Sequence, residues 1–348
     1  LLKSILKMKK SLMTLGVLAL FVLMAYGQEK KFALYSVAFY NMENLFDTIH
    51  DEGKNDYEYL PNGTNQWNTM KYKAKLKNMS EILSMLSTDK LPMGPAIIGV
   101  SEIENYRVLE DILKQPALAD RGYQYVHYEG ADQRGVDCAF FYNPKLFELT
   151  NSKLVPYVYI NDTVHKTRGF LIASGNIAGE KMHFIVNHWP SRAAASPARE
   201  RAGEQVRAIK DSLLREDSAA KIVIMGDMND DPMDKSMAVA LGAKRKPADV
   251  GPTDLYNPWW DTLKKGYGTL MYKGKWNLFD QIVFTGNLLG TDRSTLKFYK
   301  HEIFRRDFMF QKEGKYKGYP KRTQAGGVWL NGYSDHLPTI IYLIKEVK

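Results

Sequence analysis

The sequence contains a single cysteine, Cys138, among its 348 residues, which excludes an intramolecular disulfide. Because this cysteine lies in the apolar stretch VDCAFFY, we expect a buried and inert thiol. The chain also lacks internal repeats, low-complexity tracts and linkers rich in proline, glycine or serine, which favours one domain. At 45% hydrophobic and 25% charged residues, it has ample material for a core, and its stability must come from core packing.

Long hydrophobic runs are scarce, and the run near the start is short for a membrane span. Four lysines precede 14 apolar residues, Leu12–Ala25, and the small-residue stretch AYG ends the segment. A spanning helix needs about 20 apolar residues, so residues 1–27 are predicted to be a secretory signal peptide, with a single-pass anchor as the alternative. No cysteine near the cleavage point supports a lipid anchor. We therefore expect residues 28–348 to form one exported domain, periplasmic or extracellular, with no stable membrane anchor.

The basic excess of the chain is mild. The formal charge of +9 falls to +5 without residues 1–27, because that segment carries four lysines and no acid (9 − 4 = 5). Such a charge suits a polyanionic substrate. It does not indicate a surface that coats nucleic acid, for which a clustered basic stripe would be expected.

Short runs rich in β-branched and aromatic residues alternate with helical patterns. The expected strands are Ala33–Tyr40, Ala96–Val100, Val136–Tyr142, Arg168–Ser174, Met182–Val186, Ile222–Met225, Phe279–Phe284 and Pro338–Leu343. Two amphipathic helices are expected over Asn68–Leu86 and from Ser196 to about Arg215. This alternation predicts stacked sheets with flanking helices.

Acids, amides and imidazoles accompany these apolar runs. The stretches are YNMENLFD, GVSEIEN, IVNHWPSR, KIVIMGDMNDDP and GYSDHLPTI, whereas the aspartate of NLFDQIVF opens a strand. Any one of them alone would be an ordinary turn or a solvated strand end. Because the same type of ending recurs, we expect these groups to gather at one rim of a sheet and form a single polar cleft.

In this order the motifs resemble those of the endonuclease/exonuclease/phosphatase superfamily, which includes deoxyribonucleases, abasic-site endonucleases, neutral sphingomyelinases and inositol polyphosphate 5-phosphatases. The resemblance runs from Asn41 to His336, and GDMND followed much later by SDH is its most specific part. It implies an α/β fold, a four-layer sandwich of two packed central mixed sheets flanked by helices. It also implies a divalent-metal phosphoesterase site at one end of that sandwich.

The resemblance assigns roles to residues of this sequence. It implies metal ligands at Glu102, Glu43, Asn41 and Asp335, and catalytic roles for His336, Asp280, Asp227, Asn229 and His188. Substrate phosphate is expected to meet Arg134, Asn187 and Arg192. Arg134 stands where deoxyribonuclease-like members carry arginine and abasic-site enzymes carry tyrosine, which weakens any claim of abasic-site specificity.

Elementary chemistry agrees with these roles. Hydrolysis of a phosphate ester needs an activated water, neutralised charge on the phosphoryl oxygens and a stabilised leaving alkoxide. Carboxylate and amide oxygens suit Mg²⁺ or Mn²⁺, whereas zinc would favour more histidine or cysteine. Asp280 bonded to one nitrogen of His336 would leave the other free to deprotonate water or bind a phosphoryl oxygen. Whether Asp227 or His336 is the general base stays open.

The substrate is less defined than the reaction. The segment 256–281, YNPWWDTLKKGYGTLMYKGKWNLFDQ, interleaves aromatic residues with lysines that would stack bases and bind phosphates, unless the rings cover the sheet and the lysines are solvated. We expect a metal-dependent phosphodiesterase, foremost a nuclease. The alternative is a phosphatase or phospholipase C-type enzyme acting on sphingomyelin, inositol phosphates or sugar phosphates. An inactive binding module would not need the complete set of site residues, and no obligate protein partner is expected.

Overall fold

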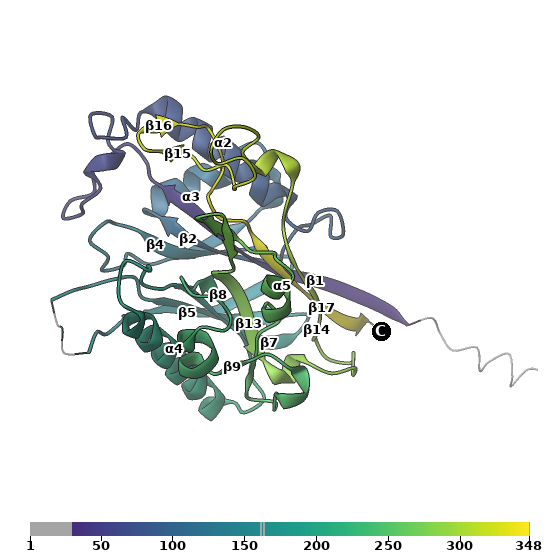
Figure 1. Cartoon of the computed structure of the whole chain (residues 1–348). Coiled ribbons are helices and arrows are strands. Elements are labelled where there is room, and N and C mark those ends of the chain that lie inside the picture. Colours follow the sequence, from purple (N-terminus) through teal and green to yellow (C-terminus); the bar gives the residue numbers. More distant parts are fainter. Residues whose placement is uncertain (1–29, 161, 163, 348) are drawn as a thin grey trace, which may run out of the picture.

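The computed structural model describes residues 30–160, 162 and 164–347 (Figure 1). The signal peptide predicted at residues 1–27 lies outside this part of the chain, and export stays a prediction. Within the described residues, no helix combines the length and the apolar character needed to cross a membrane.

Two large mixed sheets form the centre of the molecule. The first has the strand order β14-β17-β1-β2-β4-β3, and the second β5-β6-β7-β8-β13-β10-β9. The first comprises β1 (Lys31–Leu45), β2 (Ile97–Ile103), β3 (Gln124–His127), β4 (Asp137–Tyr142), β14 (Lys297–Ile303) and β17 (Thr339–Val347). The second comprises β5 (Phe147–Val155), β6 (Phe170–Ile177), β7 (Glu180–His188), β8 (Lys221–Asp227), β9 (Ala243–Lys244), β10 (Leu255–Tyr256) and β13 (Asp280–Thr285).

The remaining elements flank these sheets. The α-helices are α2 (Thr69–Met85), α3 (Tyr106–Leu113), α4 (Ser196–Glu216) and α5 (Trp260–Lys264), and a π-helical segment covers Ser236–Leu241. Short 3-10 turns occur at Tyr57–Tyr59, Ala119–Arg121, Pro247–Asp249, Gly286–Leu288 and Asp307–Met309. Two small hairpins pair β11 (Leu270–Tyr272) with β12 (Lys275–Asn277) and β15 (Gln324–Ala325) with β16 (Val328–Trp329).

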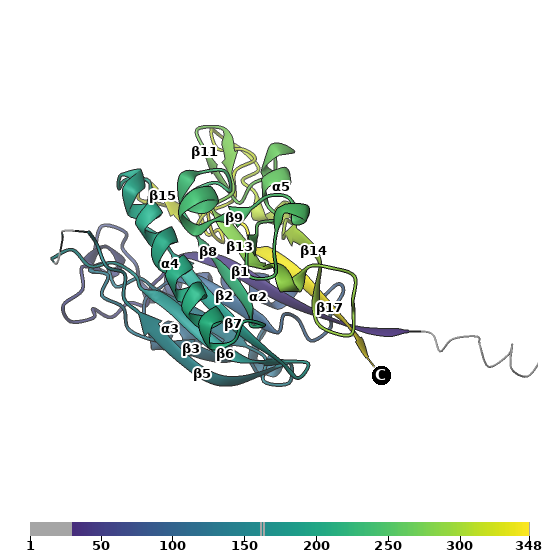
Figure 2. The ribbon, with the colours of Figure 1, turned by 90° about the horizontal axis from the view of Figure 1, so that it is seen from below.

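Side chains that alternate along β1 divide the core between layers. Val37 and Phe39 pack in the cluster between the two sheets, whereas Ala38 and Tyr40 pack toward α2 and α3. This follows from the two-residue period of a strand. Helices α2 and α3 cover the first sheet, and α4 lies across the outer face of the second (Figures 1 and 2). The predicted four-layer α/β sandwich is confirmed.

The eight predicted strands and both predicted helices are present, but nine further strands among the described residues were not predicted. Six of these are only two or three residues long: β9, β10, β11, β12, β15 and β16. The other three are β3, β5 and β14, each at an edge of its sheet. An edge strand pairs on one side and buries less of its length, so its sequence carries a weaker apolar pattern. In β5, for example, most residues are exposed or half-buried.

Cys138 and Gly226 illustrate how tightly the central layers pack. The Cys138 thiol is buried, as predicted, and burial raises its pKa far above the ordinary value, so it stays protonated. Gly226 lies opposite Asn187 across the β7–β8 pair, and a Cβ atom there would fall 2.3 Å from the Asn187 carbonyl oxygen. Glycine therefore permits the close approach of the two strands that carry His188 and Asp227.

Candidate active site

The register of the sheets brings the polar strand ends together. On the second sheet, Asp227 lies opposite both His188 on β7 and Asp280 on β13. On the first sheet, Asn41 of β1 pairs with Ser101 of β2, immediately before Glu102. The two sheets pack face to face, so these ends meet across the sandwich. Residues far apart in the sequence therefore surround one space, as predicted.

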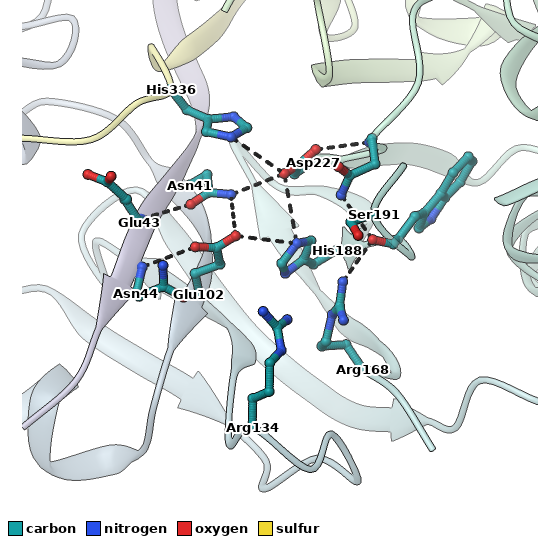
Figure 3. Close-up of polar contacts among 12 residues, drawn as sticks. Asn41, Glu43, Asn44, Glu102, Arg134, Arg168, His188, Ser191, Asp227 and His336 are labelled. Carbon is teal, nitrogen blue, oxygen red and sulfur yellow. Dashed lines mark hydrogen bonds and ion pairs between the residues drawn. The ribbon is translucent and has the colours of Figure 1, made fainter. Parts of the chain in front are cut away.

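Asn41 joins the two central carboxylates. Its side-chain nitrogen donates hydrogen bonds to Glu102 Oε1 and to Asp227 Oδ2, each at 3.1 Å (Figure 3). The backbone amide of Asn44 donates to Glu102 Oε2 at 3.0 Å. The Asn41 oxygen accepts from the Glu43 amide at 2.8 Å. In this arrangement the nitrogen of Asn41 faces the carboxylates and orients them. The predicted role of Asn41 as a metal ligand stays a prediction.

His188 lies against the same two carboxylates. Its Nε2 atom is 3.5 Å from Glu102 Oε1 and 3.8 Å from Asp227 Oδ2. Burial, followed by the positive charges of Arg168 and Arg134, holds the pKa of His188 well below its ordinary value. The imidazole is therefore neutral. Its Nδ1 atom is buried and has no hydrogen-bond partner among the described residues.

His336 is held by Asp280. The distance from His336 Nδ1 to Asp280 Oδ2 is 2.7 Å, and His336 Nε2 lies 3.9 Å from Asp227 Oδ2. Burial alone would lower the pKa of His336, but the negative charges of Asp280 and Asp227 outweigh it and raise the pKa well above the ordinary value. The predicted Asp280–His336 contact is confirmed, and it leaves Nε2 directed to Asp227.

The pKa of the Asp227 carboxyl group lies close to neutral pH. Burial, reinforced by the negative charges of Asp280 and Glu102, raises the pKa of Asp227 to about 7. His336 and the amide of Asn229, which donates to Asp227 Oδ1 at 2.9 Å, act in the opposite direction. A pKa near neutrality suits a group that takes a proton from water.

These residues fit a divalent cation. One donor atom each from Glu102, His188 and Asp227 lies within 4.8 Å of the others. The two carboxylates share the neutral Asn41 donor, and burial, followed by the negative charges of Asp280 and Glu102, raises the pKa of Asp227. A bound cation would relieve the repulsion between these charges. Glu102 would hold it, with Asp227 and His188 beside it.

Arg322 binds Glu43 and Asp335, two of the predicted metal ligands. It donates to Glu43 Oε1 and to Asp335 Oδ2, each at 2.7 Å, and the amide of Thr323 occupies Glu43 Oε2 at 2.7 Å. Figure 3 shows the Glu43 carboxylate directed away from Glu102. In this arrangement the Glu43 carboxylate is paired with Arg322 and Thr323, and its predicted role as a metal ligand stays a prediction. Asp335 keeps Oδ1 3.9 Å from His336 Nε2, so its predicted role as a ligand stays a prediction.

Asn187 has a structural role in place of the predicted contact with substrate. It is fully buried, its nitrogen donates to the carbonyls of Ile185 and Met225, and its oxygen accepts from the Trp189 indole. A substrate phosphate therefore cannot reach it. Asn187 clamps β7 to β8, and the prediction that it binds phosphate is wrong.

Arg192 and Asn229 stabilise the loop that follows β8. Arg192 donates to the Asn229 carbonyl at 3.1 Å and to Asp234 at 2.8 Å, and its guanidinium lies 4.4 Å from the centre of the Phe279 ring. Asn229 donates from its side chain to the Trp189 carbonyl at 3.0 Å. The catalytic role predicted for Asn229 and the phosphate binding predicted for Arg192 stay predictions.

Two arginines, Arg134 and Arg168, lie near Glu102 and His188 (Figure 3). Arg134 is half exposed and points toward Glu102 and His188, where a phosphoryl oxygen could reach it (Figure 3). The buried Arg168 was not predicted as a site residue. It donates to Asp132 Oδ2 at 2.9 Å and to the Trp189 carbonyl at 2.8 Å. Arg168 is the first residue of a predicted strand, and no recognisable motif surrounds it. The sequence alone therefore does not indicate a role for Arg168 in the site.

Several residues of the site have strained backbone conformations. Of the nine non-glycine residues with φ in the left-handed region among those described, four belong here: Glu43 (46°), Asn44 (57°), Glu102 (58°) and Asn229 (52°). Such conformations are sparsely populated, cost on the order of 1–3 kcal/mol each and cluster at functional sites. At Glu102 and Asn229 they turn the chain where the strands β2 and β8 end.

Comparison with known proteins identifies the family. A profile described as "Endonuclease/Exonuclease/phosphatase family" matches residues 36–345. A search of curated proteins gives no match. Among solved structures, an endonuclease/exonuclease/phosphatase family protein of Bacteroides thetaiotaomicron has a TM-score of 0.57 at 15% identity, covering 92% of this chain and 98% of its own.

Two further solved structures share the fold. A mannosyl-6-phosphatase of Bacteroides thetaiotaomicron has a TM-score of 0.55 at 14% identity, covering 89% of this chain and 99% of its own. A truncated TDP2 of Caenorhabditis elegans has a TM-score of 0.53 at 14% identity, covering 89% and 97%. Structural likeness at such identities establishes the fold alone. The profile match spans nearly all of the described chain, and with the convergent site it shows that this chain belongs to the endonuclease/exonuclease/phosphatase family of metal-dependent phosphoester hydrolases.

Proposed function

We propose that this protein is an exported phosphoester hydrolase that uses Mg²⁺ or Mn²⁺ and a water molecule activated by Asp227, with His336 stabilising the phosphoryl group. The observation that carries the proposal is the position of Asp227. Asn41 links it to Glu102 on one side, and His336 Nε2 lies 3.9 Å away on the other. A proton acceptor, a cationic imidazole and a ligand for a metal ion therefore face one space.

Glu102, with Asp227 and His188 beside it, would hold a divalent cation that would neutralise charge on the phosphoryl oxygens. Asp227, with its pKa near 7, takes a proton from the attacking water. The water oxygen forms a bond to phosphorus, the ester oxygen departs with its bonding electrons, and it takes a proton from solvent. His336, kept protonated by Asp280, donates from Nε2 to the phosphoryl group, and Arg134 binds another phosphoryl oxygen.

Export is supported by the lysines and the short apolar run of residues 1–27. The test is expression of the full chain in a bacterial host, followed by cell fractionation and N-terminal sequencing of the product. A product that begins near residue 28 in the exported fraction supports export. An uncleaved product that stays with the cytoplasm or the membrane contradicts it.

The test of the chemistry is hydrolysis of p-nitrophenyl phosphate and bis-p-nitrophenyl phosphate by the purified mature protein, with Mg²⁺, with Mn²⁺ and with EDTA. Asp227→Asn and His336→Asn should each lower the rate by about 10²–10⁴-fold. The matched control is Glu313→Gln, which changes an exposed carboxylate elsewhere. Activity that survives chelation, or either site variant retaining full turnover, would contradict the proposal.

The nuclease hypothesis has one supporting feature. The β11–β12 hairpin lies beside the site, because Leu270 forms a β-bridge with His336, and it exposes Tyr272, Lys273 and Lys275. Exposed aromatic and basic side chains suit single-stranded nucleic acid. Other rings of segment 256–281 do cover the core, for Trp259 is fully buried and donates to the Ile282 carbonyl. A phosphatase with a small leaving group is the second candidate, favoured by a pocket beside the site.

A further inference from the structure

A small polar pocket opens next to the catalytic residues. It has a volume of about 210 Å³ and is lined by Glu43 and Asn44 at the end of β1, by residues of the 58–67 segment, and by residues 322–327 around the β15–β16 hairpin. This is below the about 300–1,000 Å³ of typical small-molecule sites, so the pocket has room for a single ring and not for a longer chain.

Residues that line the pocket are bonded to residues of the catalytic site. Asn44, one of the pocket walls, donates from its backbone to Glu102, and Figure 3 places Glu43 and Asn44 on the side of Glu102 opposite Arg134. Arg322, another wall, binds both Glu43 and Asp335, and Asp335 Oδ1 lies 3.9 Å from His336 Nε2. A phosphoryl group held by the catalytic residues could therefore direct one substituent into this pocket.

Aromatic packing fixes the pocket walls before any ligand binds. Tyr59 stacks on Phe46 with ring centres 4.1 Å apart. Trp67 donates from its indole to the Phe46 carbonyl at 3.0 Å and meets Trp329 of the hairpin edge-on at 5.8 Å. Rigid aromatic walls lower the entropic cost of binding a ring-shaped ligand.

Several polar groups in the pocket have no partner. Within the described part of the chain, the Tyr59 hydroxyl and the side-chain amides of Asn44 and Gln324 make no hydrogen bond, and Nη1 of Arg322 is also free. Together they offer donors and acceptors on three sides of one small space. Such a set suits a ligand that carries several hydroxyl groups.

The charge of the lining limits the ligand further. Glu43 and Glu58 face a single cation, Arg322, which is already paired with Glu43 and Asp335. The lining therefore carries a net charge of −1 (two acids against one cation).

Lys71 and Lys75 lie behind this lining and are bonded to the Asn65 carbonyl oxygen and to Thr323 Oγ1. Because Arg322 is the one cation of the lining itself and is already paired, a second phosphate on the same substituent, or the next phosphate of a nucleic acid chain, would find no free cation among the described residues of the lining.

We propose that this pocket binds the leaving group of the substrate, and that the substrate is the phosphate monoester of a single neutral sugar ring. The inference rests on the proposed phosphoester hydrolysis and names its substrate class. The bond from phosphorus to the sugar oxygen breaks, the water oxygen takes its place on phosphorus, and the sugar leaves as an alcohol after gaining one proton.

The experiment compares kcat/KM on a panel of hexose monophosphates, a hexose bisphosphate, an inositol polyphosphate, a short oligonucleotide and p-nitrophenyl phosphate, with Mg²⁺ present. At least one hexose monophosphate should exceed each multiply charged substrate by tenfold or more. Gln324→Leu should lower kcat/KM on that hexose monophosphate about tenfold and leave p-nitrophenyl phosphate within twofold. Tyr59→Phe, which keeps the ring on Phe46, should do the same, whereas Tyr316→Phe at an exposed site is the control.

Failures of the inference and of the proposed function are distinguishable. Preference for the oligonucleotide or the inositol polyphosphate overturns the sugar-phosphate inference, as does an equal loss on all substrates in both pocket variants. In either case metal-dependent turnover of p-nitrophenyl phosphate leaves the proposed function standing. Absence of turnover on the whole panel with Mg²⁺ and with Mn²⁺ overturns the proposed function itself.

Discussion

The side chain of His301 on β14 is packed where a protonated ring is disfavoured. It lies edge-on to Trp259 with ring centres 4.8 Å apart and stacks against Phe298, and its Nε2 is 2.9 Å from the Thr262 hydroxyl. Burial, with a smaller contribution from Lys265, lowers the pKa of His301 from 6.5 to about 4. The folded protein therefore keeps this ring neutral under conditions where the unfolded chain protonates it.

The sign of the effect on stability follows from this difference. Above pH 6.5 neither state binds the proton, and His301 adds no pH dependence. Between pH 6.5 and about 4 only the unfolded state binds it, so the free energy of unfolding falls as the pH falls. At about 1.36 kcal/mol per pH unit, the loss is roughly 2 kcal/mol at pH 5 and about 3 kcal/mol when the folded state also titrates.

The assay is urea unfolding at pH 7 and pH 5 for the wild type and His301→Gln, whose amide keeps a donor for Thr262 and does not titrate. The wild type should lose about 2 kcal/mol more than His301→Gln between these pH values. His165→Gln, at an exposed histidine, is the control and should behave as the wild type. Equal losses in the wild type and His301→Gln would refute the reasoning.

Three further predictions concern the site. Asp280→Asn removes the negative charge that keeps His336 protonated, so the alkaline limb of the pH–rate profile should move to lower pH; an unchanged profile would contradict the pairing. Asn41→Leu removes the donor shared by Glu102 and Asp227 and should weaken Mn²⁺ binding, measured by calorimetry, about 10–100-fold; unchanged affinity would exclude this role. Gly226→Ala places a Cβ atom against the Asn187 carbonyl, so it should lower the free energy of unfolding, measured in urea, by about 1–3 kcal/mol. A variant as stable as the wild type would show that β7 and β8 can move apart at no cost.

The sequence indicated the central strands because their apolar runs are long and buried on both faces. Edge strands such as β5 were not predicted. A strand that pairs on one side only can keep many polar residues, so it lacks a long apolar run. Glu102, Asp227 and Asp280 end or begin central strands, so the apolar runs beside them also indicated these residues. The register of the sheets places Asp227 opposite Asp280, whereas Glu102 lies in the irregularity between Ser101 and Ile103.

The orientation of individual side chains could not be predicted in the same way. Glu43 belongs to a matching motif, yet Arg322, 279 residues later, turns its carboxylate away from Glu102. Asn187 sits in a matching motif as well, but the close approach of β7 and β8 buries its amide. Arg168 and Arg322 come from segments without a motif, so only the folded chain brings them near the site.

The most direct test of the account is a crystal structure of the mature protein with Mn²⁺, in which anomalous scattering locates the ion. The account predicts one ion bound by Glu102, in the space that Asp227 and His188 also face, with Glu43 still paired to Arg322. An ion bound at Glu43 and away from Glu102, or a site with Glu102 far from Asp227, would contradict it.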